Sequence, residues 1–123
     1  HPIGGGLYYD DQKPEALRRA ADFRASRLPK YLGYFERLLA KHPRGGLAGA
    51  KLCYADLSLF QTIDGLAYAF PQAMSGANRR YPRLHALHDR VAARPRVKAY
   101  LASVRRIPFN ELGIFRHYPE LDG

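Results

Sequence analysis

The stretch from Lys51 to Phe70 is the most apolar part of the chain, and it constrains the fold more than any other. Its apolar residues recur at steps of three and four, which is the period of an α-helix. They are Leu52, Ala55, Leu59, Phe60, Ile63, Ala67 and Phe70, with Leu57, Leu66 and Tyr68 widening the stripe. A surface helix keeps a narrower apolar stripe. The sequence therefore predicts a central helix that has neighbours on most of its sides.

The start of this helix is marked by Cys53 and Asp56, which stand three positions apart. In a capping box the first residue caps the helix, and the residue three positions on reaches back to the backbone N–H of the cap. Asp56 would also lie near the positive end of the helix dipole. A thiol is a weaker acceptor than the usual Ser or Thr hydroxyl, so Cys53 is an unusual cap. We predict that Cys53 and Asp56 form a structural N-capping box.

Apolar periodicity and the positions of prolines predict the rest of the chain. We expect a long helix over 14–40 that kinks at Pro29, a polar loop over 71–80, helices over 82–94 and 95–103, and an extended tail over 107–122 that covers the helices. The glycine-rich residues 1–6 are expected to be poorly ordered. No alternation typical of strands occurs. The predicted fold class is all-α, a single helical domain over 1–123 with about four helices and a packed C-terminal tail.

The formal charge is +9, and most of it lies between Arg79 and Arg106. This stretch holds eight arginines and Lys98 against Asp89 alone, which gives +8. An acidic partner or nucleic acid is one interpretation of this charge, and a solvated basic face is the other. These arginines do not alternate with aromatic residues, as the groove of a single-strand-binding protein requires. Nucleic acid is therefore not an expected partner.

The sequence predicts no catalytic residue and no metal site. It contains no Ser/His/Asp constellation, carboxylate pair or phosphate-binding glycine loop. His85 and His88 could place two ligands on one helix face, but no third ligand stands at a matching spacing. Cys53 is the only cysteine, which excludes an internal disulfide and suits a reducing, cytoplasmic setting. Its apolar surroundings argue against a reactive thiol. No segment is long and apolar enough to cross a membrane.

Three motifs in order resemble the C-terminal domain of cytosolic glutathione S-transferases of the pi, sigma and mu-like classes. The first is Gly49-x-x-x-Cys53-x-Ala55-Asp56, followed by Leu57-Ser-Leu-Phe60, where the family has Ser or Thr in place of Cys53. The second runs from Leu28-Pro29 to Leu39, and the third from Tyr81-Pro82 to Pro95, followed by Val97 to Leu101. Together they cover residues 28 to 103.

The resemblance implies a two-domain parent protein. A thioredoxin-like N-terminal domain, absent from this sequence, would bind glutathione and stabilise its thiolate. The helical domain would supply most of the pocket for a small electrophilic co-substrate. No cofactor is implied beyond glutathione as a co-substrate, and a homodimer is possible. The first residues lack an initiator Met, and they are interpreted as the middle of a longer protein. The isolated chain would then be inactive, because its glutathione-binding domain is missing.

The resemblance also suggests pocket residues. Tyr8 and Tyr9 are the nearest counterparts of tyrosines that face the electrophile in pi-like members, although either could be a core residue instead. Ile114 and Phe115 in the tail could close the pocket, as C-terminal segments do in several classes. Asp56 corresponds to a folding residue and not a catalytic one. The alternative function is a non-catalytic, transferase-like helical module that binds protein or nucleic acid.

Overall fold

The computed structural model describes residues 8–123, and the sequence-based expectation for residues 1–6 lies outside them. The described part is helical and contains no strand, with one isolated bridge between Gly46 and Gly49. The predicted all-α fold is confirmed. The helices are α1 (Lys13–Asp22), α2 (Leu28–Ala40), α3 (Tyr54–Ala69), α4 (Pro71–Met74), α5 (Ala77–Arg80), α6 (Pro82–Ala92), α7 (Pro95–Leu101) and α8 (Pro119–Asp122), with a 3-10 turn η1 (Tyr9–Gln12) and a π-helical segment η2 (Phe23–Arg27). No described helix could span a membrane.

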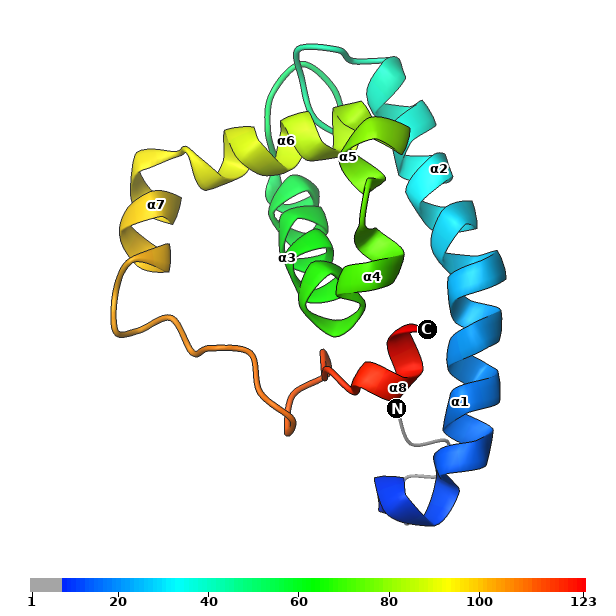
Figure 1. The fold of residues 1–123 in the computed structure, drawn as a ribbon. Helices are drawn as coiled ribbons and strands as arrows, with labels where there is room; N and C mark the ends of the chain where they lie inside the picture. The colour runs from blue at the N-terminus through cyan, green and yellow to red at the C-terminus, as the bar shows by residue number, and fades with distance from the viewer. Residues whose placement is uncertain (1–7) are drawn as a thin grey trace.

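Helix α3 lies at the centre, with α2 on one side and α6 crossing near its N-terminal end (Figure 1). The core joins these three helices to the short helices α4 and α5. Its buried members are Leu28, Leu32, Leu39, Leu59, Phe60, Ile63, Met74, Ala77, Leu84, Leu87 and Val91. The apolar stripe of α3 is narrower than predicted, because Leu57 and Ala67 are exposed. Helix α3 is therefore central but not enclosed on every side.

The first long helix differs in detail from its prediction. The structure has α1 and α2 joined by the π-helical segment, and the three form one long column (Figure 1). In an α-helix the ring of Pro29 would clash with the carbonyl of Ala25, and its missing N–H would leave that carbonyl unbonded. The π-helical turn is wider and shifts the hydrogen-bond pattern of the backbone: the Leu28 N–H bonds to the Phe23 carbonyl, five residues back, instead of to the carbonyl four residues back. The π segment accommodates the proline within a helical run.

The predicted loop over 71–80 is wrong, because this stretch forms the single-turn helices α4 and α5. The Asp122 carboxylate accepts hydrogen bonds from the backbone N–H groups of Gln72 (2.6 Å) and Ala73 (3.0 Å), which caps α4. Gly76 joins the two helices with φ of +72°, a conformation that glycine adopts readily. A cap from 50 positions away, at Asp122, cannot be seen in the local sequence.

The tail is extended up to Tyr118, but it covers the helices less than predicted, because Ile107, Leu112 and Ile114 are exposed. It then ends in α8, which the sequence did not predict. It turns back beneath α3 and brings α8 beside α1 (Figure 1). The Phe109 ring stacks on Tyr68 of α3, with ring centres 4.9 Å apart. Arg24 donates a hydrogen bond to the Leu121 carbonyl. A second small core of Ala16, Ala20, Ala69, Phe70 and Leu121 thus joins α1, the end of α3 and α8.

The N-terminus of α3 is organised by the fully buried carboxylate of Asp56. One oxygen accepts the backbone N–H of Cys53 at 2.7 Å, and the other accepts that of Leu47 at 2.8 Å. The first contact is the capping-box geometry, and the second holds the loop that precedes the helix. Gly46 lies so close to this carboxylate that a Cβ atom there would overlap it. Asp56 therefore joins the α2–α3 loop to the central helix.

We expect Asp56→Ala to lower the free energy of unfolding by about 3 kcal/mol or more, because two buried N–H donors lose a charged acceptor. Asp22→Ala is the control, since Asp22 is exposed. It should change stability by less than about 0.5 kcal/mol. Urea unfolding followed by circular dichroism measures both values. Similar stabilities for the two variants would contradict the role given to Asp56.

Candidate functional site

An apolar hollow lies between α1, the C-terminal half of α3 and the tail. Its volume is about 260 Å³. Three parts of the chain line it. Helix α1 and the start of η2 contribute Ala16, Arg19, Ala20 and Phe23; α3 and the residue after it contribute Leu66, Ala69 and Phe70; the tail contributes Ile114 and Phe115. Arg19 is the only charged residue among them. Such a hollow can hold an apolar ligand with one polar or anionic group near Arg19.

The tail supplies the third wall of this hollow. Phe115 lies directly on Gly65 of α3, where a Cβ atom would collide with its ring. Nδ1 of His117 lies 3.3 Å from the carbonyl oxygen of Ala69, and this contact ties the tail to the last residue of α3. Ile114 is 82% exposed, so it forms the open rim of the hollow. The structure thus brings the two predicted tail residues together at one site.

Tyr8 and Tyr9 line a different hollow, which they share with Tyr118 and Glu120. Tyr8 is exposed. The Tyr9 ring stacks on Tyr118 with centres 4.0 Å apart, and its hydroxyl donates to Glu120 at 2.8 Å. Burial, and then the Glu120 carboxylate, raise the pKa of the Tyr9 phenol above its ordinary value. Tyr9 is therefore a neutral hydrogen-bond donor that fastens η1 to α8.

Sequence reasoning missed the part of the hollow that α1 contributes. Ala16 and Ala20 are both buried and stand four positions apart, which places them on one face of the helix. Their small side chains leave room beside Phe70 and Leu66. The spacing was visible in the sequence, but small residues on a helix face predict close packing as readily as they predict a pocket.

Part of the basic stretch Arg79–Arg106 is used inside the domain. Arg83 pairs with Glu36 at 3.2 Å, and Arg106 pairs with Asp64 at 3.1 Å. Arg90 donates to the carbonyls of Arg44 (2.9 Å) and Gly45 (2.6 Å), which fixes the α2–α3 loop. Among residues 8–123 no group of three or more His, Cys, Asp or Glu side chains is placed to hold a metal ion.

The central capped helix, its surrounding helices and the apolar hollow define a helical domain of the transferase type that the motifs suggested. The family model described as glutathione S-transferase, C-terminal domain, matches residues 1–104. The chain therefore belongs to this family.

Individual relatives agree with this assignment. The chain is 37% identical over 78 residues to glutathione S-transferase P 1 of Bufo bufo, which covers 62% of the chain and 35% of that protein. It is 33% identical over 76 residues to a glutathione S-transferase of Plasmodium yoelii yoelii, with coverage of 62% and 34%. It is 31% identical over 107 residues to glutathione S-transferase A3 of Mus musculus, with coverage of 85% and 47%. The matched part thus spans about a third to a half of these relatives.

We expect Gly65→Ala to disturb the hollow. Replacing a glycine within a helix by alanine normally stabilises it by about 1 kcal/mol. Here the new Cβ would meet the Phe115 ring, and such overpacking costs about 1–3 kcal/mol. The net result should be a displaced tail that trypsin cleaves faster at Arg116.

Gly33→Ala in α2 is the matched control, because its Cβ would meet only the flexible end of Arg37 at 3.3 Å. It should stabilise the domain by up to about 1 kcal/mol and leave cleavage of the tail unchanged. Limited proteolysis read by mass spectrometry, together with urea unfolding, measures both effects. If Gly65→Ala is cleaved at Arg116 no faster than Gly33→Ala, the contact between Phe115 and Gly65 is contradicted.

Proposed function

We propose that this chain is the electrophile-binding domain of a glutathione transferase. In this proposal the apolar hollow between α1, α3 and the tail forms one wall of the pocket for the electrophilic co-substrate. The observation that carries the proposal is the lining of that hollow, in which Arg19 is the only charged residue. Burial of an apolar co-substrate there would be favourable by about 25 cal/mol for each Å² removed from water.

The reaction assigned to the complete enzyme is attack by the glutathione thiolate on an electrophilic carbon. A carbon–sulfur bond forms. In a substitution the displaced electron pair leaves with a leaving group; in an addition to an activated double bond the pair of that bond moves onto its electron-withdrawing group, and the anion that results takes up a proton from water. In this scheme the residues of the present chain bind and orient the electrophile and exclude water from it. No residue among 8–123 is given the role of base or nucleophile in this scheme, and burial, followed by the Glu120 carboxylate, raises the pKa of Tyr9 and keeps it a neutral phenol.

The partner that completes the pocket would be a thioredoxin-like domain that binds glutathione. Support comes from exposed apolar side chains on the same two elements that line the hollow, α1 and the tail, which a second domain could cover. Leu112 and Ile114 in the tail and Leu17 on α1 are all exposed. Assembly into a homodimer and a cytoplasmic setting, which suits the free thiol of Cys53, belong to the same proposal.

The isolated 123-residue chain should conjugate glutathione to 1-chloro-2,4-dinitrobenzene no faster than the uncatalysed reaction. The physical reason is that thiolate formation needs groups that this chain does not supply. The absorbance of the conjugate measures the rate, and an intact-mass measurement verifies that the protein assayed is this chain. Clear turnover by the pure chain would show that the helical domain activates a thiol itself, and would overturn this division of labour.

Ile114→Ala should weaken binding of an apolar anionic probe, 8-anilinonaphthalene-1-sulfonate, by about 3- to 10-fold, since burial of the larger side chain contributes roughly 1 kcal/mol. Ile107→Ala is the matched control, because Ile107 lies in the same tail and is 79% exposed but does not line the hollow. It should leave the dissociation constant unchanged. Fluorescence titration measures both, and equal affinities for the two variants would argue against ligand binding in this hollow.

A further inference from the structure

The tail residues 106–118, which we name the strap, are fastened at two separate ends. At the C-terminal end Tyr118 stacks on Tyr9, and α8 follows with Asp122 capping α4. At the N-terminal end the fastening is the guanidinium of Arg106. Between these ends the strap passes over the face of α3 on which Phe115 meets Gly65. The position of the strap over the hollow therefore depends on what holds Arg106.

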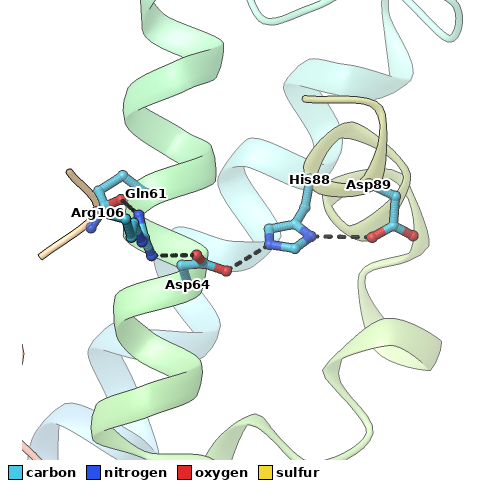
Figure 2. A network of polar contacts seen from close by, with 5 residues as sticks. All are labelled: Gln61, Asp64, His88, Asp89 and Arg106. Atoms are coloured by element: carbon cyan, nitrogen blue, oxygen red, sulfur yellow. Dashed lines mark hydrogen bonds and ion pairs between the residues drawn. The ribbon is translucent and has the colours of Figure 1, made fainter. Parts of the chain in front are cut away.

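Arg106 is held by a polar network that joins three elements (Figure 2). Its Nη2 donates to Asp64 Oδ2 of α3 at 3.1 Å, and its Nη1 donates to Gln61 Oε1 at 3.3 Å. The other oxygen of Asp64 lies 2.8 Å from Nε2 of His88 on α6. Nδ1 of His88 lies 3.1 Å from Asp89. Asp64 is thus the single link between α6 and the strap in this network.

The network is partly shielded from water. The side chains of Arg106, His88 and Asp64 are 21%, 22% and 28% exposed, whereas that of Asp89 is 79% exposed. Ion pairs at the open surface contribute little to stability, and shielded pairs with fixed partners contribute more. The His88 ring also stacks on Phe60 of the core, with centres 4.8 Å apart. Asp64 therefore presents Arg106 with a carboxylate that is held in place from the other side.

Contacts lead from Arg106 to the hollow in short steps. The guanidinium lies over the Phe109 ring, 5.4 Å from its centre. Phe109 stacks on Tyr68 and meets the edge of Phe115 with ring centres 6.0 Å apart. Phe115 lines the hollow. A shift of Arg106 would therefore be passed through one aromatic ring to the wall of the pocket.

We propose that Asp64 is a positioning residue for the electrophile pocket, because it fixes Arg106 and so sets where Phe109 and Phe115 lie on α3. This inference rests on the function proposed above for the hollow. Loss of the link leaves the fastening at Tyr118 and Asp122 intact. The strap then moves over a wider range without leaving the domain, and the hollow loses a wall of defined shape.

The test compares Asp64→Asn and Arg106→Gln with the control Asp89→Asn, all in the 123-residue chain. Asp89 contacts the same His88 ring but has no contact with Arg106, so its variant changes the charge near His88 and spares the strap. Hydrogen exchange read by mass spectrometry follows the backbone amides of residues 107–117. Fluorescence titration with 8-anilinonaphthalene-1-sulfonate follows the hollow, and urea unfolding records global stability.

We expect about 3- to 10-fold faster exchange in the strap and a similar weakening of probe binding in Asp64→Asn and in Arg106→Gln, as loss of one shielded ion pair implies. The double variant should match the single ones, because both remove the same link. Asp89→Asn should behave as wild type in both measurements. Arg106→Gln alters only the strap side of the link, so it keeps the test valid if Asp64→Asn lowers global stability.

Unchanged strap exchange in Asp64→Asn and Arg106→Gln would overturn the inference, and so would equal effects of Asp89→Asn. Faster exchange without weaker binding would also overturn it, provided that Ile114→Ala does weaken binding. A third outcome is faster strap exchange in Asp64→Asn together with unchanged probe binding in both Asp64→Asn and Ile114→Ala. This outcome would support the link between Asp64 and the strap. It would reject the hollow as the ligand site and, with it, the proposed function.

Discussion

The buried carboxylate of Asp56 is the interaction on which the rest of this structure depends. It accepts the N–H of Cys53 at the start of α3 and the N–H of Leu47 in the preceding loop. An unpaired buried carboxylate or N–H would be costly, so these groups stabilise the domain only in this arrangement. The start of the central helix and the path of the chain leading into it are thereby fixed together. Helices α4 and α6 pack against α3 in the position that results.

The same device recurs at two further helices, with acceptors from distant parts of the sequence. Glu36 of α2 accepts the backbone N–H groups of Arg83 (3.1 Å) and Leu84 (3.0 Å) at the start of α6. Asp122 does the same for α4. A carboxylate at a helix N-terminus satisfies orphan donors and interacts favourably with the helix dipole. Each of these contacts also joins two elements, so capping determines how the helices are assembled as well as where they begin.

This difference in sequence distance explains what could be predicted. Asp56 stands only three residues from Cys53, the residue whose N–H it accepts, so this capping contact could be predicted from the local sequence. The apolar periodicity of α3 and α6 extends over several turns, so these two helices could be predicted as well. Helices α4 and α5 have four residues each, which is too short for a period, and the cap of α4 comes from Asp122. The hollow joins three separated segments, so the sequence could suggest Ile114 and Phe115 only through the resemblance to a family. Tyr8 and Tyr9 were suggested in the same way, but the structure places them in a separate hollow.

The walls of the hollow are not equally free to change. Ala16, Ala20 and Ala69 belong to the second core as well as to the hollow, so larger residues there would overpack the contact between α1 and α3. Ile114 is exposed at the rim and packs against no buried core, and its replacement costs little stability. The shape of the pocket can therefore change through the strap without loss of the fold. Under the proposed function, a preference for one electrophile over another would be set by the strap and by the link at Asp64 that holds it, because the helices cannot change shape as freely.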